Sequence, residues 1–180
     1  SGTQYTPEKG WDENKLDFFR RHIVQLGRSG LFVVYDELVG KEPVEWNYLL
    51  HTVELPMEVA EEKDGLRILG KNKADGVSIA HLFSSQKMTY AQTDTFFVAA
   101  VDWKKRLGKT LSNHYHFTAT TASCSKICFL NVIDVHGNNR ADAVINRERN
   151  RITVEEWVIE CNLEGEGNAF LYIENKQNGV

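Results

Sequence analysis

Short runs of apolar residues separated by turn residues dominate the chain from residue 18 onward. Residues 18–26 are rich in β-branched and aromatic side chains, and the four residues 27–30 connect them to the apolar run 31–35. A third run, 46–53, follows 40–43, where glycine permits a positive φ and proline cannot join a central ladder. This pattern predicts three consecutive antiparallel strands, a meander, with a turn at 40–43.

The rest of the chain continues in the same way, with Asp-Gly, Asn and Gly clusters between the runs. Further strands are expected at 66–69, 76–83, 95–101, 114–121, 126–135, 143–146, 152–160 and 170–174. Helical turns are conceivable only at 12–19, 57–62 and 102–107, and none of them has a cap followed by a long apolar stripe. The sequence therefore predicts an all-β protein, an antiparallel β-sandwich of about ten to eleven strands with little helix.

The domain organisation follows from where this pattern begins. Residues 1–17 are polar and read as a lead-in or linker, whereas 18–180 show no repeat and no change of composition, which favours a single β-sandwich domain. In 152–160, apolar side chains occupy both registers of the expected strand, which is typical of a strand covered partly on its second face. The chain begins without an initiator Met or an apolar leader, so we expect a processed product or a piece of a longer protein.

Composition removes several classes of function. The net charge is −4, and 21 basic residues are spread among 25 acidic ones, which argues against duplex nucleic acid as a partner. The apolar runs are only a few residues long, so no membrane span is expected. The three cysteines, Cys124, Cys128 and Cys161, form no C-x-x-C pair; we expect buried free thiols, with a disulfide from Cys161 to one of the others as the alternative.

Two histidines in the sequence have the spacing of metal ligands. His114 and His116 lie on one face of an expected strand, about 6.5 Å apart along the backbone, which would suit two ligands of one metal. A third ligand would have to come from His22, His51 or His81, and no spacing links them to the pair. We therefore predict no metal site, with His114 and His116 as the candidates if one exists, and a hydrogen-bonded or solvated pair otherwise.

One concentrated basic patch stands beside an aromatic residue in an expected loop, comprising Trp103, Lys104, Lys105 and Arg106. Sulfates and carboxylates pair with Lys and Arg through charge-assisted hydrogen bonds, and an indole face can stack on a sugar ring. The patch is a candidate substrate-binding site for an anionic saccharide. The alternative is an exposed charged loop that Trp103 anchors to the core.

Polar residues of the expected meander have structural explanations. Arg20 and His22 share one face of their strand, and Arg21 points to the other. An arginine that pairs with Asp36 across the hairpin would set the register of the two strands. His51 lies within an apolar strand, and we expect it to be a buried, hydrogen-bonded histidine rather than an acid or a base. No catalytic residue is assigned, since G-x-S-x-G, Walker, H-E-x-x-H and Rossmann signatures are absent from the sequence.

Segment 20–56 reads RRHIVQLGRSGLFVVYDELVGKEPVEWNYLLHTVELP. Its paired basic residues and histidine before an apolar strand, its hairpin, the LFVVYDEL strand, the proline-containing link and WNYLLHT ahead of a proline resemble the C-terminal β-sandwich region of the heparinase II/III-like polysaccharide lyases. The strand-rich remainder, to about residue 172, agrees with this resemblance.

The resemblance implies a parent enzyme exported to the periplasm, or secreted, that cleaves acidic glycosaminoglycans by β-elimination. In that family the catalytic Tyr, Asn and His lie mostly in an N-terminal helical catalytic domain, and an earlier part of the sandwich contributes a further His and a structural divalent metal. No histidine of this chain aligns with those positions. The resemblance therefore implies a non-catalytic module without a cofactor, inactive alone, that supports the catalytic domain and has substrate contact as a further option.

Two other classes of function remain open. One is a free-standing carbohydrate-binding domain, for which exposed aromatics beside a polar groove are expected. The other is an adhesin-type interaction sandwich, for which a large exposed apolar face is expected.

Overall fold

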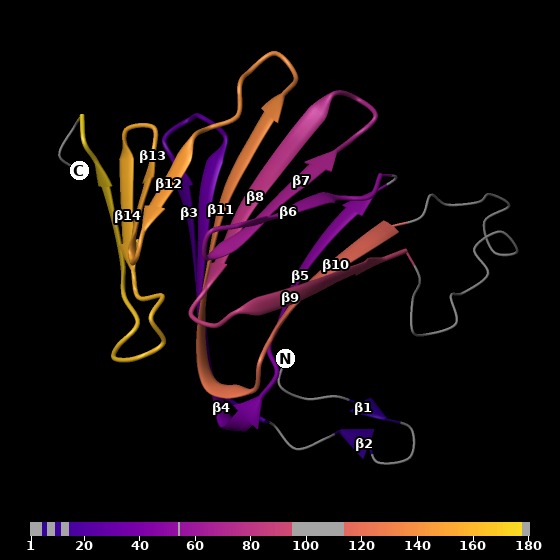
Figure 1. Ribbon diagram of the computed structural model, residues 1–180, viewed down its shortest axis with the longest axis vertical. Helices are drawn as coiled ribbons and strands as arrows, with labels where there is room; N and C mark the ends of the chain where they lie inside the picture. Colours follow the sequence, from indigo (N-terminus) through magenta and orange to yellow (C-terminus); the bar gives the residue numbers. More distant parts are fainter. Residues whose placement is uncertain (1–4, 7–9, 12–14, 54, 95–113, 178–180) are drawn as a thin grey trace, which may run out of the picture.

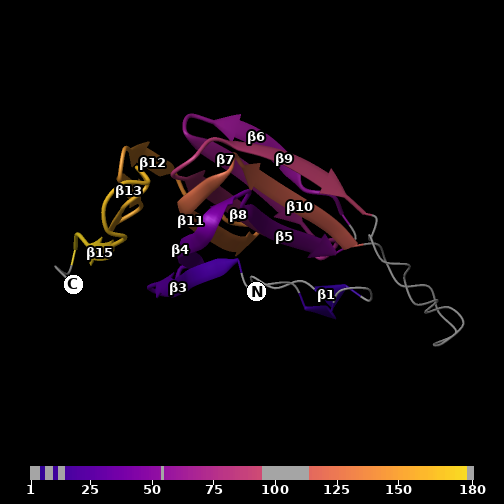
Figure 2. The same ribbon diagram turned by 90° about the horizontal axis from the view of Figure 1, so that it is seen from below.

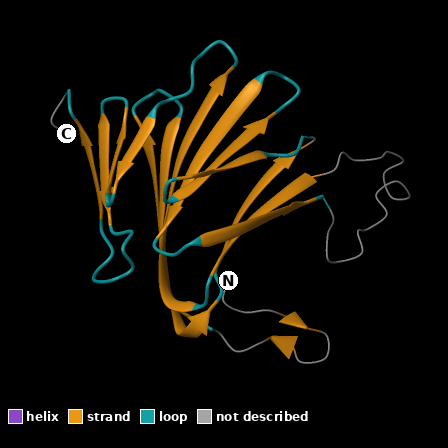
Figure 3. Ribbon diagram, in the orientation of Figure 1, coloured by secondary structure: helices purple, strands orange, loops and turns teal. Residues whose placement is uncertain are grey.

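Strands make up all the regular secondary structure in the described part of the chain (Figure 3). The structure is a computed structural model, and it describes residues 5–6, 10–11, 15–53, 55–94 and 114–177. The strand expected at 95–101 and the helical turn considered at 102–107 lie outside the described residues. No helix in the described residues has the length and hydropathy needed to cross a membrane.

The described residues form fifteen strands. Their bounds are β1 Tyr5–Thr6, β2 Gly10–Trp11, β3 Leu16–Leu26, β4 Leu31–Val44, β5 Asn47–Val53, β6 Glu58–Glu62, β7 Gly65–Lys71, β8 Gly76–Ser84, β9 Met88–Thr93, β10 His114–Thr121, β11 Cys124–Gly137, β12 Ile145–Glu148, β13 Arg151–Val154, β14 Trp157–Cys161 and β15 Leu171–Asn175. The predicted antiparallel all-β sandwich is confirmed, but the described residues form more strands than the ten to eleven expected.

Three sheets carry the fold (Figure 1). The central sheet has six antiparallel strands in the order β3-β4-β11-β8-β7-β6. A three-stranded sheet, β5-β10-β9, and a four-stranded sheet, β12-β13-β14-β15, flank it, and β1 pairs with β2 as a separate ribbon. In the view from below, the β12–β15 sheet lies on one side of the molecule and β5, β9 and β10 lie on the other (Figure 2).

Strand β11 shows how the central sheet is covered on both faces. Successive side chains of a strand point to opposite faces, and Cys128, Leu130 and Val132 enter one buried cluster while Ile127 and Phe129 enter another. The first cluster, called core one here, includes residues of β13 and β14. The second, core two, includes residues of β5 and β10. The domain is thus built in three layers, with an apolar core on each side of the central sheet.

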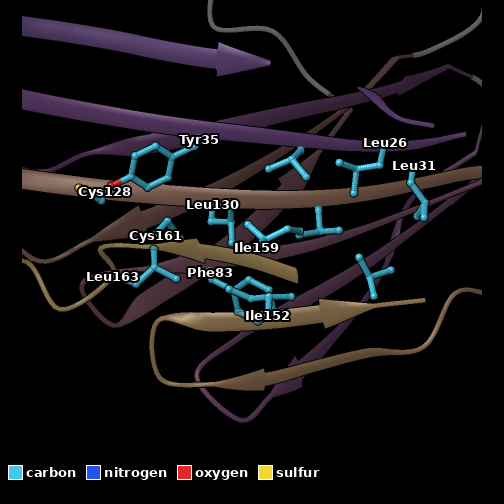
Figure 4. Close-up of a cluster of buried hydrophobic side chains, with 13 residues drawn as sticks. Leu26, Leu31, Tyr35, Phe83, Cys128, Leu130, Ile152, Ile159, Cys161 and Leu163 are labelled. Carbon is cyan, nitrogen blue, oxygen red and sulfur yellow. The ribbon is translucent and has the colours of Figure 1, made fainter. Parts of the chain in front are cut away.

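Core one lies between the central sheet and the β12–β15 sheet (Figure 4). Leu130, Ile152 and Ile159 have no exposed surface. Tyr35 joins the two layers directly, because its hydroxyl donates a 3.1 Å hydrogen bond to the backbone carbonyl of Asn162. Burial of this phenol raises its pKa well above the usual range. The layers are therefore held together by apolar packing and by a buried polar link.

Core two is more aromatic. Tyr48 and Phe129 lie with their ring centroids 5.4 Å apart, and Trp46 donates from its indole to the carbonyl of Cys124 at 2.9 Å. The Nδ2 of the fully buried Asn131 donates to the Tyr48 hydroxyl at 3.2 Å. The aromatic residues thus bind β5 to the central sheet through their polar ends as well as their rings.

The predicted meander is wrong beyond its first hairpin. Strand β4 does not end before Gly40 but continues to Val44, and β5 pairs with β10 in a different sheet. Residues 40–43 leave the ladder with β11, since Val39 pairs with Lys126 and Val44 with Cys124, and Pro43 falls in this bulge. A Cβ on Gly40 would lie 2.8 Å from the carbonyl oxygen of Glu42 and 3.3 Å from the Trp46 ring, so glycine permits the close approach of the indole. The glycine and proline mark a bend within a strand rather than a turn.

The single strand expected at 152–160 is also wrong, because these residues form a hairpin. Val154 pairs with Trp157, and Glu155 turns the chain with a φ of 49°. The mixed apolar pattern arises because the chain reverses between its two halves. Residues 58–62, considered helical, form the edge strand β6, and the 12–19 region enters β3 at Leu16.

The cysteines are free, as the sequence predicts. Cys128 and Cys161 are buried in core one, whereas Cys124 is half-buried. Burial raises the pKa of all three thiols, that of Cys161 to about 12.

This environment predicts selective thiol reactivity. In folded protein at pH 8, a soluble aromatic disulfide should modify Cys124 first, and Cys128 and Cys161 should react only on unfolding, because the thiolate is the nucleophile and burial suppresses it. Counting released thiolate with and without denaturant measures this. Rapid modification of three thiols in folded protein would contradict the buried placement.

The bidentate pair between Arg21 and Asp36 allows a stability test. Asp36 is 2% exposed, and the Arg21 Nε and Nη2 atoms each lie 2.7 Å from its oxygens. Arg21→Gln should lower the free energy of unfolding by about 3 kcal/mol, because it leaves a buried carboxylate without its cation. Arg20→Gln is the matched control on the same strand and should change it by less than about 0.5 kcal/mol. Urea unfolding of both variants measures these free energies. An equal loss of unfolding free energy in the two variants would contradict this role for the ion pair.

Candidate functional site

The histidine pair singled out in the sequence lies on β10, next to β5. His116 pairs in register with His51, and their rings meet edge to face with centroids 4.6 Å apart. His51 is exposed, so the expectation of a buried histidine is wrong; β5 is the edge strand of the smaller sheet and leaves one face open. Burial of its ring atoms, followed by the nearby His116 and His114, lowers the pKa of His51.

The other histidines do not complete a metal site. His81 lies on β8, where its side chain faces the β12–β15 side of the central sheet, and its Nδ1 lies 3.0 Å from Oε2 of Glu62. His22 lies on β3, on that same side. No group of three or more His, Cys, Asp and Glu side chains in the described residues has the arrangement of a metal site. His114 and His116 thus lie beside His51, and the three rings do not have the arrangement of a metal site.

The cross-strand ion pair expected at Asp36 is confirmed, and Arg21 is its partner. The two residues face each other in the β3–β4 register. The hydrogen bond to Asp36 raises the pKa of Arg21. Burial raises the pKa of Tyr48, which lies in the same region of core two. These groups fix the register of β3 and β4 and satisfy polar atoms of the core.

The basic patch at Trp103, Lys104, Lys105 and Arg106 lies outside the described residues. Its role in substrate binding stays a prediction.

One groove in the described structure combines unpaired basic groups with an aromatic residue. It lies between β3–β4 and the segment that leads into β15, has a volume of about 520 Å³, and is called the β3–β15 groove here. Its lining residues are Arg20, His22, Val24, Tyr35, Glu37, Ala169, Phe170, Leu171 and Ile173. Arg20, His22 and Phe170 are exposed, whereas Tyr35 is buried at its base.

Two other cavities differ in character. One, of about 400 Å³, lies between β5 and strands β7–β8 and is lined mainly by apolar groups such as Leu50, Met57 and Ile133. The other, of about 470 Å³, has three acidic residues and Arg147, but the Arg147 guanidinium already donates to the carbonyls of Arg149 and Asp64. The β3–β15 groove is therefore the best candidate for a ligand.

Sequence reasoning missed a polar network around a buried aspartate at the end of β11. Asp134 is 1% exposed and accepts hydrogen bonds from the Ala143 backbone at 2.8 Å and from Arg140. The Nε2 of His136 lies 3.3 Å from Oδ1 of Asp142, and Oδ2 of the same carboxylate accepts a hydrogen bond from Arg67 at 2.9 Å. The alternation of β11 could have indicated that Asp134 faces core one. These hydrogen bonds hold the connection between β11 and β12 against the central sheet, which is a structural role.

Comparison with known protein families and with curated proteins finds no match to this chain. Comparison with solved structures finds matches in fold. A heparinase III structure, the BT4657 gene product, matches with a TM-score of 0.50 and 14% sequence identity, over 86% of this chain and 23% of that protein. A structure of the same gene product with methylated lysines matches over the same shares, with a TM-score of 0.45 and 13% identity.

At this identity the match concerns the fold. The resemblance to heparinase II/III-like lyases inferred from segment 20–56 is confirmed at that level, and the chain spans less than a quarter of the heparinase III that it matches. The chain has the fold of a heparinase-like β-sandwich region.

Proposed function

We propose that this chain is a non-catalytic β-sandwich module of a heparinase II/III-like polysaccharide lyase. The observation that carries the proposal is the fold match, which extends over 86% of this chain but only 23% of a heparinase III. A module of that proportion would leave most of the parent enzyme, including an N-terminal helical catalytic domain, outside this chain. Its parent would act on acidic glycosaminoglycans by β-elimination.

Three buried polar side chains have structural roles, in agreement with a supporting module. Asp36, Asp134 and His81 are buried, and each has a partner that fixes strand or loop position. A general base needs an acceptor that can reach a substrate proton, and buried groups committed to structural partners do not offer one. Export of the parent to the periplasm or the medium is part of the same proposal.

The first test is enzymatic. The purified chain, incubated with heparin, heparan sulfate or alginate, should give no rise in the ultraviolet absorbance of unsaturated uronates, whereas an active lyase used as the positive control should. A clear rise with the chain alone would contradict the proposed non-catalytic role.

A second candidate function is a carbohydrate-binding domain. The observation that favours it is the exposed aromatic residue Phe170, which lines the β3–β15 groove. The predicted patch at 103–106 offers a separate way to bind sulfated glycans.

Chromatography on an immobilised sulfated glycan tests that patch. If it binds, Trp103→Ala and Lys104→Ala should abolish most of the retardation, because they remove a stacking face and a cation. Lys63→Ala, at an exposed turn, is the matched control and should leave elution unchanged. Unaltered retardation of the Trp103 and Lys104 variants would exclude the patch.

A further inference from the structure

Two neighbouring arginines of β3 have different electrostatic surroundings. Arg21 faces core two and forms the bidentate pair with Asp36. Arg20 points to the opposite face, and its partner in the strand register is Glu37. An ion pair between Arg20 and Glu37 would be the ordinary arrangement for opposite charges at this position.

That ion pair does not form. The Glu37 carboxylate lies 3.2 Å from Nζ of Lys126 instead. Within the described part of the chain, Arg20 has no acidic side chain within ion-pair distance, and its guanidinium lies over the Phe18 ring, 5.0 Å from the centroid. Arg20 is thus a cation at the groove whose hydrogen-bond donors are available to a ligand.

His22 strengthens the same surface. It follows Arg20 by two residues, so both side chains lie on one face of β3, roughly 7 Å apart along the strand. Both line the β3–β15 groove. Two basic side chains on one wall favour an anionic ligand, and the planar guanidinium is suited to a carboxylate or a sulfate, which it can hold through two parallel hydrogen bonds.

The rest of the groove favours a ligand with a ring. The apolar part of the groove wall consists of Val24, Leu171 and Ile173, which also pack against core one. Phe170 is 48% exposed and lines the groove from the segment that leads into β15. An aromatic face presented beside a charged group fits a ligand that has both an apolar ring face and an anionic substituent. A volume of about 520 Å³ is within the range of small-molecule sites.

The segment that carries Phe170 is held in place before any ligand binds. Lys126 donates from Nζ to the carbonyl of Gly167 at 2.9 Å, which ties this segment to the central sheet. The Asn162 amide donates to the carbonyls of Glu166 and Asn168 at 2.5 and 3.0 Å. A groove preorganised in this way loses less conformational entropy when it binds a ligand.

We infer that the β3–β15 groove binds a short acidic saccharide, whose carboxylate or sulfate contacts Arg20 and His22 and whose ring lies against Phe170. The anionic character of the ligand is argued from the groove alone, whereas its identity as a sugar rests on the proposed function.

Binding of tetrasaccharides to the whole chain, measured by calorimetry, tests this inference. The probes are tetrasaccharides from heparin, chondroitin sulfate, hyaluronan and alginate, with cellotetraose as the neutral control. At least one acidic tetrasaccharide should bind, and cellotetraose should bind at least tenfold more weakly. Arg20→Gln should weaken binding about tenfold or more, as expected for the loss of hydrogen bonds to a charged group. Phe170→Ala should weaken it about threefold, the usual effect of losing an aromatic contact.

Matched controls separate a defined site from general attraction. Arg28→Gln removes the same charge from the exposed β3–β4 turn, and Phe19→Ala removes an exposed ring from the opposite face of β3. Both should change the affinity less than twofold. Urea unfolding of each variant establishes that it is folded.

Three results would overturn the inference: no binding of any acidic tetrasaccharide, equal weakening by Arg20→Gln and Arg28→Gln, or binding of cellotetraose as tight as that of the acidic probes. None of them bears on whether the chain is catalytic. Conversely, lyase activity of the chain would contradict the proposed function and leave these affinity ratios as they are.

Discussion

The fold depends on the requirement that strand β11 be apolar on both faces. Its alternate side chains contribute to both cores, so neither flanking sheet could be removed without exposing apolar surface of the central sheet. The polar exceptions on this strand are satisfied locally, Asn131 by the Tyr48 hydroxyl and Asp134 by the Ala143 backbone and Arg140. A buried polar group is tolerated only with such partners, and here they also connect the layers.

The candidate site is a consequence of this layering. The β12–β15 sheet covers the central sheet over core one, and the β3–β15 groove lies at the margin of that contact, where Tyr35 is buried and Arg20 is exposed. The apolar packing between the two sheets ends at this margin. Polar side chains there face the groove, which is open to solvent or a ligand. Lys126 matters doubly here, because it neutralises Glu37 and anchors the segment that leads to Phe170. The pairing with Glu37 leaves the Arg20 guanidinium as a positive charge in the groove, and the bond to Gly167 holds the segment that carries Phe170.

Much of the fold could be predicted from the sequence, because alternation and turn residues are local signals. They correctly indicated the β3–β4 hairpin and strands β7, β8, β10, β11 and β15. Edge strands β6 and β9 were missed because each presents mostly exposed side chains and therefore lacks an apolar face. The 152–160 hairpin was misread because Glu155 adopts a positive φ without the glycine or asparagine that usually announces it. For the site, sequence reasoning placed Arg20 and His22 on one face and assigned Asp36 an arginine partner, but no local pattern links them to Phe170.

The all-β class, the positions of most strands and the side chains that share a strand face follow from local sequence signals, because the extended backbone has a period of two residues. Two other features depend on tertiary contacts. One is the set of strands in each sheet, in which β5 pairs with β10 rather than β4, and the other is the pairing of charges, in which Glu37 pairs with Lys126 rather than Arg20. Those outcomes depend on contacts between residues distant in sequence, whose geometry is set only when the three layers pack together.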